Sequence, residues 1–125
     1  IIHCRYSHLK AFEMVKEKSI RRAVFHWYSG PIDVLDKILA MGYFISATPA
    51  LIYSPPHQEA IQRTPLERIL LETDSPVSHQ GKEAMPKDVW ISMERVAKLK
   101  GLDLFLVSEQ TTISASQFFQ IPFKP

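Results

Sequence analysis

The chain alternates short apolar runs with helical segments, and this order limits its fold more than any other feature. The apolar runs predict strands at residues 1–3, 21–26, 43–47 and 68–74. Helical spacing and helix-end residues predict helices at 8–18, 31–42, 57–63 and 86–101. The tail, 102–119, predicts one or two further helices. Strands that alternate with helices favour parallel βαβ units over a sandwich, so we expect an α/β fold.

The spacing of the strand ends suits half of a (β/α)8 barrel. The ends near residues 3, 26, 46 and 74 are separated by 23, 20 and 28 residues. A complete barrel uses about 30 residues for each strand and helix, so four such units fill a chain of this length. On the pattern alone, a flavodoxin-like open sheet is the alternative.

Composition places the chain among globular domains and argues against a disulfide-bonded or membrane-spanning protein. The 125 residues are 46% hydrophobic and 22% charged, which is typical of one folded domain. A formal net charge of +2 gives no argument by itself for a nucleic acid or a membrane as partner. The single cysteine, Cys4, cannot form an internal disulfide, and no apolar run approaches the roughly 20 residues that span a bilayer. We therefore expect a cytoplasmic protein.

Polar side chains that can bind a metal stand at three of the four strand ends. His3 and His26 end the first two strands, and the fourth runs from apolar residues into Asp74. The carboxyl ends of parallel strands meet on one face, so these side chains should lie close together. Imidazole nitrogens and carboxylate oxygens are ordinary ligands of zinc and similar divalent ions, and a bound ion activates water. Each residue also has a structural alternative: a hydrogen-bonded histidine, or an aspartate in a turn.

Four more side chains on the expected face have ordinary explanations. His57 and His79 lie in loops bearing proline or glycine, and we expect both to be solvated. Trp27 and Tyr53 are placed where they can stack on a base or a sugar, although packing explains them equally well.

Four motifs in register resemble the C-terminal half of the TatD-like metal-dependent hydrolases, which are TIM barrels of the amidohydrolase type. The motifs are HCR at 3–5, FHWYSG at 25–30, GYFIS at 42–46 and LLETDSP at 70–76. The resemblance implies that residues 1–125 form a single segment holding strands five to eight of the barrel with their helices. The chain begins inside a strand and without methionine, so we expect that residue 1 is not the natural start.

The resemblance also implies an activity and roles for six residues. The family members are divalent-metal-dependent phosphodiesterases, usually deoxyribonucleases, which implies DNA as substrate and Zn, Mg or Mn ions, two of them in a complete barrel. By motif, His3, His26 and Asp74 are metal ligands, and Asp74 also handles the proton of the attacking water. Arg5, Ser29 and Gly30 match positions on the same face, where a guanidinium can hold a phosphate.

Departures from the family pattern leave other functions open. The His-x-His pair and the glutamate that complete the family's metal site belong upstream of residue 1, so closing the barrel needs a missing N-terminal half-barrel or a second chain. The chain reads EAMP at 83–86 instead of Asn-x-Pro, and Ser114 stands where an asparagine is expected. The alternatives are an ester, amide or aminoacyl-tRNA hydrolase, and a fragment or scaffold without catalytic activity.

Overall fold

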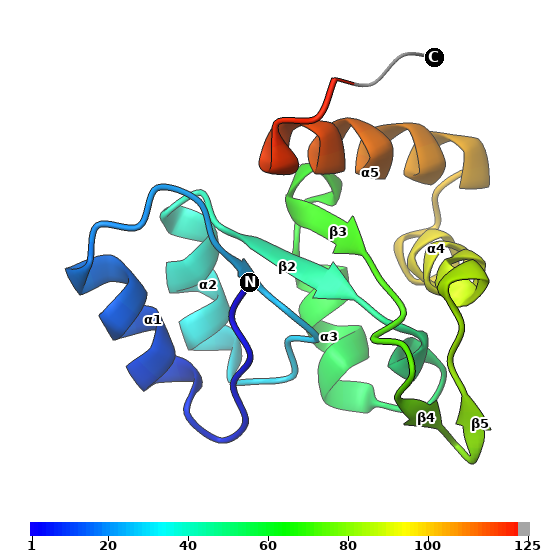
Figure 1. The fold of residues 1–125 in the computed structure, drawn as a ribbon, viewed down its shortest axis with the longest axis horizontal. Coiled ribbons are helices and arrows are strands. Elements are labelled where there is room, and N and C mark those ends of the chain that lie inside the picture. Colours follow the sequence, from blue (N-terminus) through cyan, green and yellow to red (C-terminus); the bar gives the residue numbers. More distant parts are fainter. Residues whose placement is uncertain (123–125) are drawn as a thin grey trace.

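The computed structural model describes residues 1–122 and contains a parallel sheet with helices packed against it (Figure 1). The sheet has the order β1 (Val24–Phe25), β2 (Phe44–Ala47), β3 (Ile69–Leu71), with parallel pairing throughout. Ile2 adds an isolated parallel bridge to Phe25, at the position of the first predicted strand. The α/β prediction is confirmed, although the strands are shorter than expected. The last three residues of the predicted segment 1–125 lie outside the described residues.

The α-helices are α1 (His8–Glu17), α2 (Ile32–Ala40), α3 (Pro55–Arg63), α4 (Val89–Lys100) and α5 (Leu104–Phe119). The tail is therefore one continuous helix. Short 3-10 turns precede or join these elements at Pro49–Ile52, Leu66–Arg68 and Pro86–Asp88. A small antiparallel hairpin, β4 (Ser78–His79) and β5 (Lys82–Glu83), occupies the segment that the sequence predicted to be a loop. Among the described residues no helix is both long and apolar enough to cross a membrane.

Local residue choice explains where the last two helices begin and end. Gly101 ends α4 in the left-handed conformation, with φ of 63°, as its sequence position predicted. The Asp103 side chain then accepts hydrogen bonds from Phe105 N and Leu106 N, which caps the start of α5.

Two predicted helix faces are partly wrong. The helical spacing of Leu9, Phe12 and Val15 predicts that these three residues form the apolar face of the first helix. In the structure Leu9 is 42% exposed, and His8 is buried instead. The buried face of α1 runs through His8, Phe12 and Val15, at spacings of four and three residues, and Leu9 lies beside it. The spacing of Val89, Met93 and Val96 likewise predicts one apolar face in the helix at 86–101. Met93 and Val96 are buried in α4, whereas Val89 is 37% exposed.

Alternation along the strands divides the sheet into two faces. Phe25, Ile45 and Ile69 are fully buried against the helices in the main core. Their neighbours Val24, Phe44 and Leu70 form a second cluster on the opposite face. Because side chains two residues apart share a face, His26, Ser46 and Glu72 continue this second face toward the strand ends. The polar strand ends therefore project from the face opposite the main helical core.

The last turn of α5 covers the beginning of the strands, away from the β4–β5 hairpin (Figure 1). The Phe118 ring packs edge-on against Phe44, the first residue of β2, with ring centroids 5.2 Å apart. Arg22, just before β1, donates from its guanidinium to the Phe118 carbonyl at 2.8 Å. Phe118 therefore anchors α5 to the second face.

We predict that Phe118→Ala lowers the free energy of unfolding by roughly 2–3 kcal/mol, less than the loss for a fully buried phenylalanine. Phe119→Ala is the matched control, because Phe119 is 50% exposed, and it should cost less than about 1 kcal/mol. Urea unfolding measures both values. Equal losses for the two variants would contradict the anchoring role of Phe118.

Candidate metal centre

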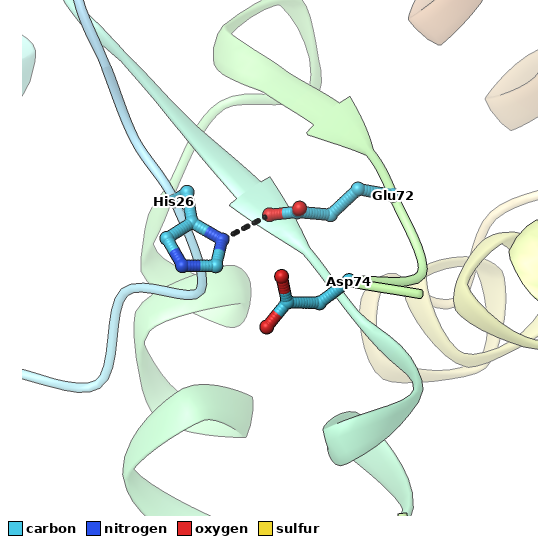
Figure 2. Close-up of side chains that lie close together, drawn as sticks. All are labelled: His26, Glu72 and Asp74. Atoms are coloured by element: carbon cyan, nitrogen blue, oxygen red, sulfur yellow. Dashed lines mark hydrogen bonds and ion pairs between the residues drawn. The ribbon is translucent and has the colours of Figure 1, made fainter. Parts of the chain in front are cut away.

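His26, at the end of β1, uses its two ring nitrogens for different partners. Nδ1 lies 3.0 Å from Glu72 Oε1, and Nε2 lies 3.0 Å from His3 Nδ1 (the Glu72 contact is drawn in Figure 2). An ionised carboxylate only accepts, so His26 Nδ1 carries the proton and donates it to Glu72. In the neutral ring this leaves a lone pair on Nε2, directed at His3.

Glu72 is held from a second direction by the middle strand. The Ser46 hydroxyl, at the end of β2, donates a short hydrogen bond to Glu72 Oε1. Ser46 Oγ in turn accepts from the backbone N–H of Trp27 at 3.0 Å. The ends of all three strands are thus joined through one carboxylate.

Glu72 is a site residue that the sequence prediction did not include, although the LLETDSP motif contains it. The detectable signal is the two-residue period of the strand, which places Glu72 on the same face as Leu70 and Ser46. A carboxylate on this period, next to a strand that ends in histidine, is the feature that would have predicted it.

Asp74, in the loop after β3, lies close to His26 and Glu72. Figure 2 shows its carboxylate directed toward His26 and Glu72, and the possible ligand atoms of the three residues all lie within 4.8 Å of one another. The Asp74 backbone is left-handed, with φ of 56°, a conformation that aspartate tolerates better than most residues. Within the described part of the chain its carboxylate accepts no hydrogen bond, which leaves both oxygens available.

The geometry and the donor types suit a divalent cation. Metal–nitrogen bonds of about 2.0–2.1 Å put two ligands of one ion roughly 3 Å apart, and His3 Nδ1 and His26 Nε2 have this separation. Imidazole suits zinc, and the added carboxylates also suit manganese or magnesium. A carboxylate that accepts the second proton of a ligating histidine, as Glu72 does for His26, is the usual support of such a site.

The predicted site residues share one cleft, with one exception. His3, Arg5, His26, Ser29 and Asp74 all line a cleft of about 620 Å³. Among the described residues Arg5 forms no ion pair with an acidic side chain, so its guanidinium is available to a ligand.

Gly30 is the exception, and packing gives a separate reason for a glycine there. It lines a neighbouring hollow, which meets the cleft at Tyr6, His8 and Ser29. A Cβ added at Gly30 would stand 2.4 Å from Cγ of the His8 ring. The substrate role of Gly30 stays a prediction, while its lack of a side chain makes room for His8.

His57 is buried, and the prediction of a solvated loop histidine is wrong. Its Nδ1–H donates to the Tyr28 carbonyl at 2.7 Å, and its Nε2 accepts from the Thr48 N–H at 3.2 Å. These bonds join the loop after β1 to the loop after β2. Burial lowers the pKa of His57 to about 4, so the ring is neutral at physiological pH.

His79 is also buried, contrary to the same prediction, at 9% exposed. The reason is the unpredicted hairpin, which folds β4 back against the loop after β3 so that His79 Nε2 donates to the Thr73 carbonyl at 3.1 Å. Both histidines therefore serve as links between loops that surround the cleft.

Comparison with known proteins places this arrangement in a family. The profile of the TatD related DNase family matches residues 1–120. The chain belongs to this family. A relative from Haemophilus influenzae, named an uncharacterized metal-dependent hydrolase, is 31% identical over 113 residues, which are 89% of this chain and 45% of the relative. Deoxyribonuclease TATDN3 of Homo sapiens is 31% identical over 120 residues, 94% of this chain and 44% of that protein.

The solved structures agree with the fold. The crystal structure of YJJV, a TATD homolog from Escherichia coli K12, matches with a TM-score of 0.87 at 23% identity, over 96% of this chain and 49% of that one. The chain thus spans about half the length of the relatives it matches. Its α/β fold is that of part of a TatD structure, while the numbering of its strands as five to eight stays a prediction.

We predict that His57 makes stability depend on pH between its folded and unfolded pKa values. The unfolded ring takes up a proton near pH 6.5, whereas the folded ring resists protonation until about pH 4. Stability is therefore fully present above this window and falls as the pH drops through it, by roughly 3 kcal/mol at most. His57→Gln should remove this part of the slope, as measured by urea unfolding at pH 7.5, 5.5 and 4. An unchanged slope in the variant would assign the pH dependence to other groups.

We predict that Gly30→Ala destabilises the fold by roughly 1–3 kcal/mol because the new methyl group displaces the His8 ring. The His8 ring packs edge-on against Tyr28, with centroids 4.9 Å apart. In a double-mutant cycle, His8→Ala should abolish the extra cost of Gly30→Ala, since it removes the clashing ring. Strictly additive losses in thermal unfolding would show that the two residues do not interact.

Proposed function

We propose that this chain is the C-terminal half of a TatD-family, divalent-metal-dependent hydrolase that cleaves phosphodiesters of DNA. One observation carries the proposal. His3, His26 and Asp74 line one cleft together with Arg5. There His3 Nδ1 lies 3.0 Å from His26 Nε2, and the possible ligand atoms of His26, Glu72 and Asp74 all lie within 4.8 Å of one another. The names of two relatives, a metal-dependent hydrolase and a deoxyribonuclease, support the same reaction and substrate.

His3 Nδ1, His26 Nε2 and the Asp74 carboxylate would hold the metal. When bound, a divalent ion lowers the pKa of a water molecule and stabilises negative charge on a phosphate. Glu72 keeps the His26 lone pair on Nε2 by accepting the proton at Nδ1, and Ser46 holds Glu72 in place. Without Glu72, either nitrogen of His26 can carry the proton, and the ligand geometry is lost part of the time.

Asp74 is proposed to transfer a proton, and Arg5 and Ser29 to bind the phosphate. The Asp74 carboxylate, which accepts no hydrogen bond within the described residues, is placed to take the proton from an attacking water. The Arg5 guanidinium offers paired N–H donors to phosphate oxygens from the rim of the cleft. The Ser29 hydroxyl, on the same rim, supplies a neutral donor.

Completion of the site needs residues from another segment. On the second face α5 already buries Val24, Phe44 and Leu70. Ile1 and Phe119 line a small hollow beside Val24 and Leu70 and are 80% and 50% exposed. In a closed barrel such a face is covered by the remaining strands. We infer that an N-terminal half-barrel, or a second chain, covers it and contributes the ligands of a second metal ion.

We predict that Asp74→Asn reduces metal-dependent hydrolysis of a single-stranded oligodeoxynucleotide by at least about 100-fold, because the amide cannot accept the proton. The assay uses this chain alone and joined to the half of a TatD relative that it does not match, with Zn, Mn or Mg. Asp36→Asn is the control, because Asp36 pairs with Arg63 on the surface. His26→Ala should lower the bound metal measured by mass spectrometry.

Three results would overturn parts of the proposal. Full activity of Asp74→Asn would remove its role in proton transfer. Cleavage of carboxylic esters without cleavage of oligonucleotides would favour the ester hydrolase alternative. No metal in any form would leave a scaffold without catalytic activity as the better interpretation.

A further inference from the structure

We propose that Trp27 and Tyr53, supported by the buried ring of His79, form a stacking subsite for the nucleobase next to the cleaved phosphodiester. We call these three side chains the aromatic wall. The proposal rests on the proposed function, because it names the part of the substrate that the cleft recognises besides the phosphate. The candidate metal centre does not use these residues.

Two members of the aromatic wall line the same cleft as the candidate metal ligands. Trp27 directly follows His26, and both Trp27 and Tyr53 line the cleft together with Asp74. The His79 ring lies behind them, with its centroid 5.2 Å from that of Trp27 and 6.1 Å from that of Tyr53. A ring that stacks on Trp27 or Tyr53 therefore lies beside the candidate metal centre.

Hydrogen bonds hold the aromatic wall in position. His79 Nε2 faces the Thr73 carbonyl at 3.1 Å, so it carries the proton, and Nδ1 must accept. The Tyr53 hydroxyl donates to Nδ1 at 2.9 Å. Because Thr73 is adjacent to Asp74, the position of Tyr53 is tied to the loop that carries the candidate catalytic carboxylate. The Tyr53 hydroxyl is used inside the protein, while the residue stays 36% exposed.

The backbone at Trp27 adds a second, independent observation. Its φ of 46° lies in the left-handed region, which is uncommon and strained for a bulky residue. The Ser46 side chain holds this conformation through the Trp27 N–H. A glycine or asparagine would relieve the strain, yet the chain has a partly exposed tryptophan at the mouth of the cleft. The uncovered part of this ring is available to a ligand in the cleft.

The chemistry of the cleft identifies a nucleobase as the stacked group. Arg5 offers a phosphate contact and the aromatic wall offers π-faces, and a nucleotide carries both a phosphate and a flat ring. A base inside a duplex is covered by its neighbours, so stacking on the aromatic wall requires a single strand or a frayed end. DNA and RNA bases present the same π-face, so either can supply the ring.

A single-tryptophan form of the chain tests the subsite directly. The chain contains two tryptophans, and Trp90, 53% exposed on α4, does not line the cleft. In a Trp90→Phe background, the fluorescence of Trp27 is titrated with a thymidine dinucleotide, its ribose counterpart and an abasic dinucleotide with the same phosphodiester. We expect quenching by both base-containing ligands, and roughly 10-fold weaker binding of the abasic one.

Substitutions of Trp27 and Tyr53 test whether their rings contact the base. Calorimetry should show that Trp27→Leu, and separately Tyr53→Leu, weakens binding of the thymidine dinucleotide roughly 5- to 100-fold. Both should leave binding of the abasic ligand unchanged. Trp27→Phe keeps a ring and should retain most of the affinity. Trp90→Leu is the matched control and should bind as the parent does.

The outcomes separate this proposal from the proposed function. Equal affinity for the base-containing and abasic ligands would overturn the subsite, even if the chain hydrolyses phosphodiesters. Base-dependent quenching without hydrolysis by any form would support the subsite and contradict the hydrolase proposal. Weaker binding of both ligands by Trp27→Leu would overturn it too, because the loss would then come from a disturbed cleft.

Discussion

The hydrogen bond from His26 Nδ1 to Glu72 joins the first strand of the sheet to the third, and the candidate metal centre depends on it. It decides which nitrogen of His26 faces His3, and therefore whether two imidazole lone pairs can meet one cation. Ser46, on the strand between, supports the same carboxylate. The parallel register makes this possible, because Ser46 pairs with Leu70 and Glu72 lies two residues farther along the same face. A shift of one residue in any strand would turn its polar end toward the helical core.

The two faces of the sheet have different physical roles. The face toward the helices is a closed apolar core that holds the strands in register. The other face is apolar at the strand beginnings, where Phe118 packs on Phe44, and polar at the strand ends. Stability and candidate chemistry are thus separated along the same strands, an arrangement that lets the strand ends carry exposed histidines and carboxylates without disturbing the core.

Two histidines link the loops around the cleft through hydrogen bonds at both ring nitrogens. His57 joins the loops after β1 and β2, and His79 joins the loop after β3 to Tyr53. A neutral imidazole can donate from one nitrogen and accept at the other, so it links two loops without burying a charge. The low pKa of His57 is the consequence of that burial. These links place Trp27 and Tyr53 beside the candidate metal centre.

The sequence by itself determined the order of strands and helices, and its strand ends placed His3, His26 and Asp74 on one face. These features follow from periodicity and from the parallel connection, which act over a few residues or one βαβ unit. Arg5 and Ser29 were predicted only from the resemblance of their motifs to the TatD family. Only the tertiary structure decided that Glu72 orients His26, a contact across 46 residues, and that His57 is buried against Tyr28, 29 residues away. Burial and tautomer depend on partners that are distant in the sequence, and a local pattern carries no information about them. The hairpin that buries His79 escaped prediction for a related reason, since its two-residue strands are too short to show a period.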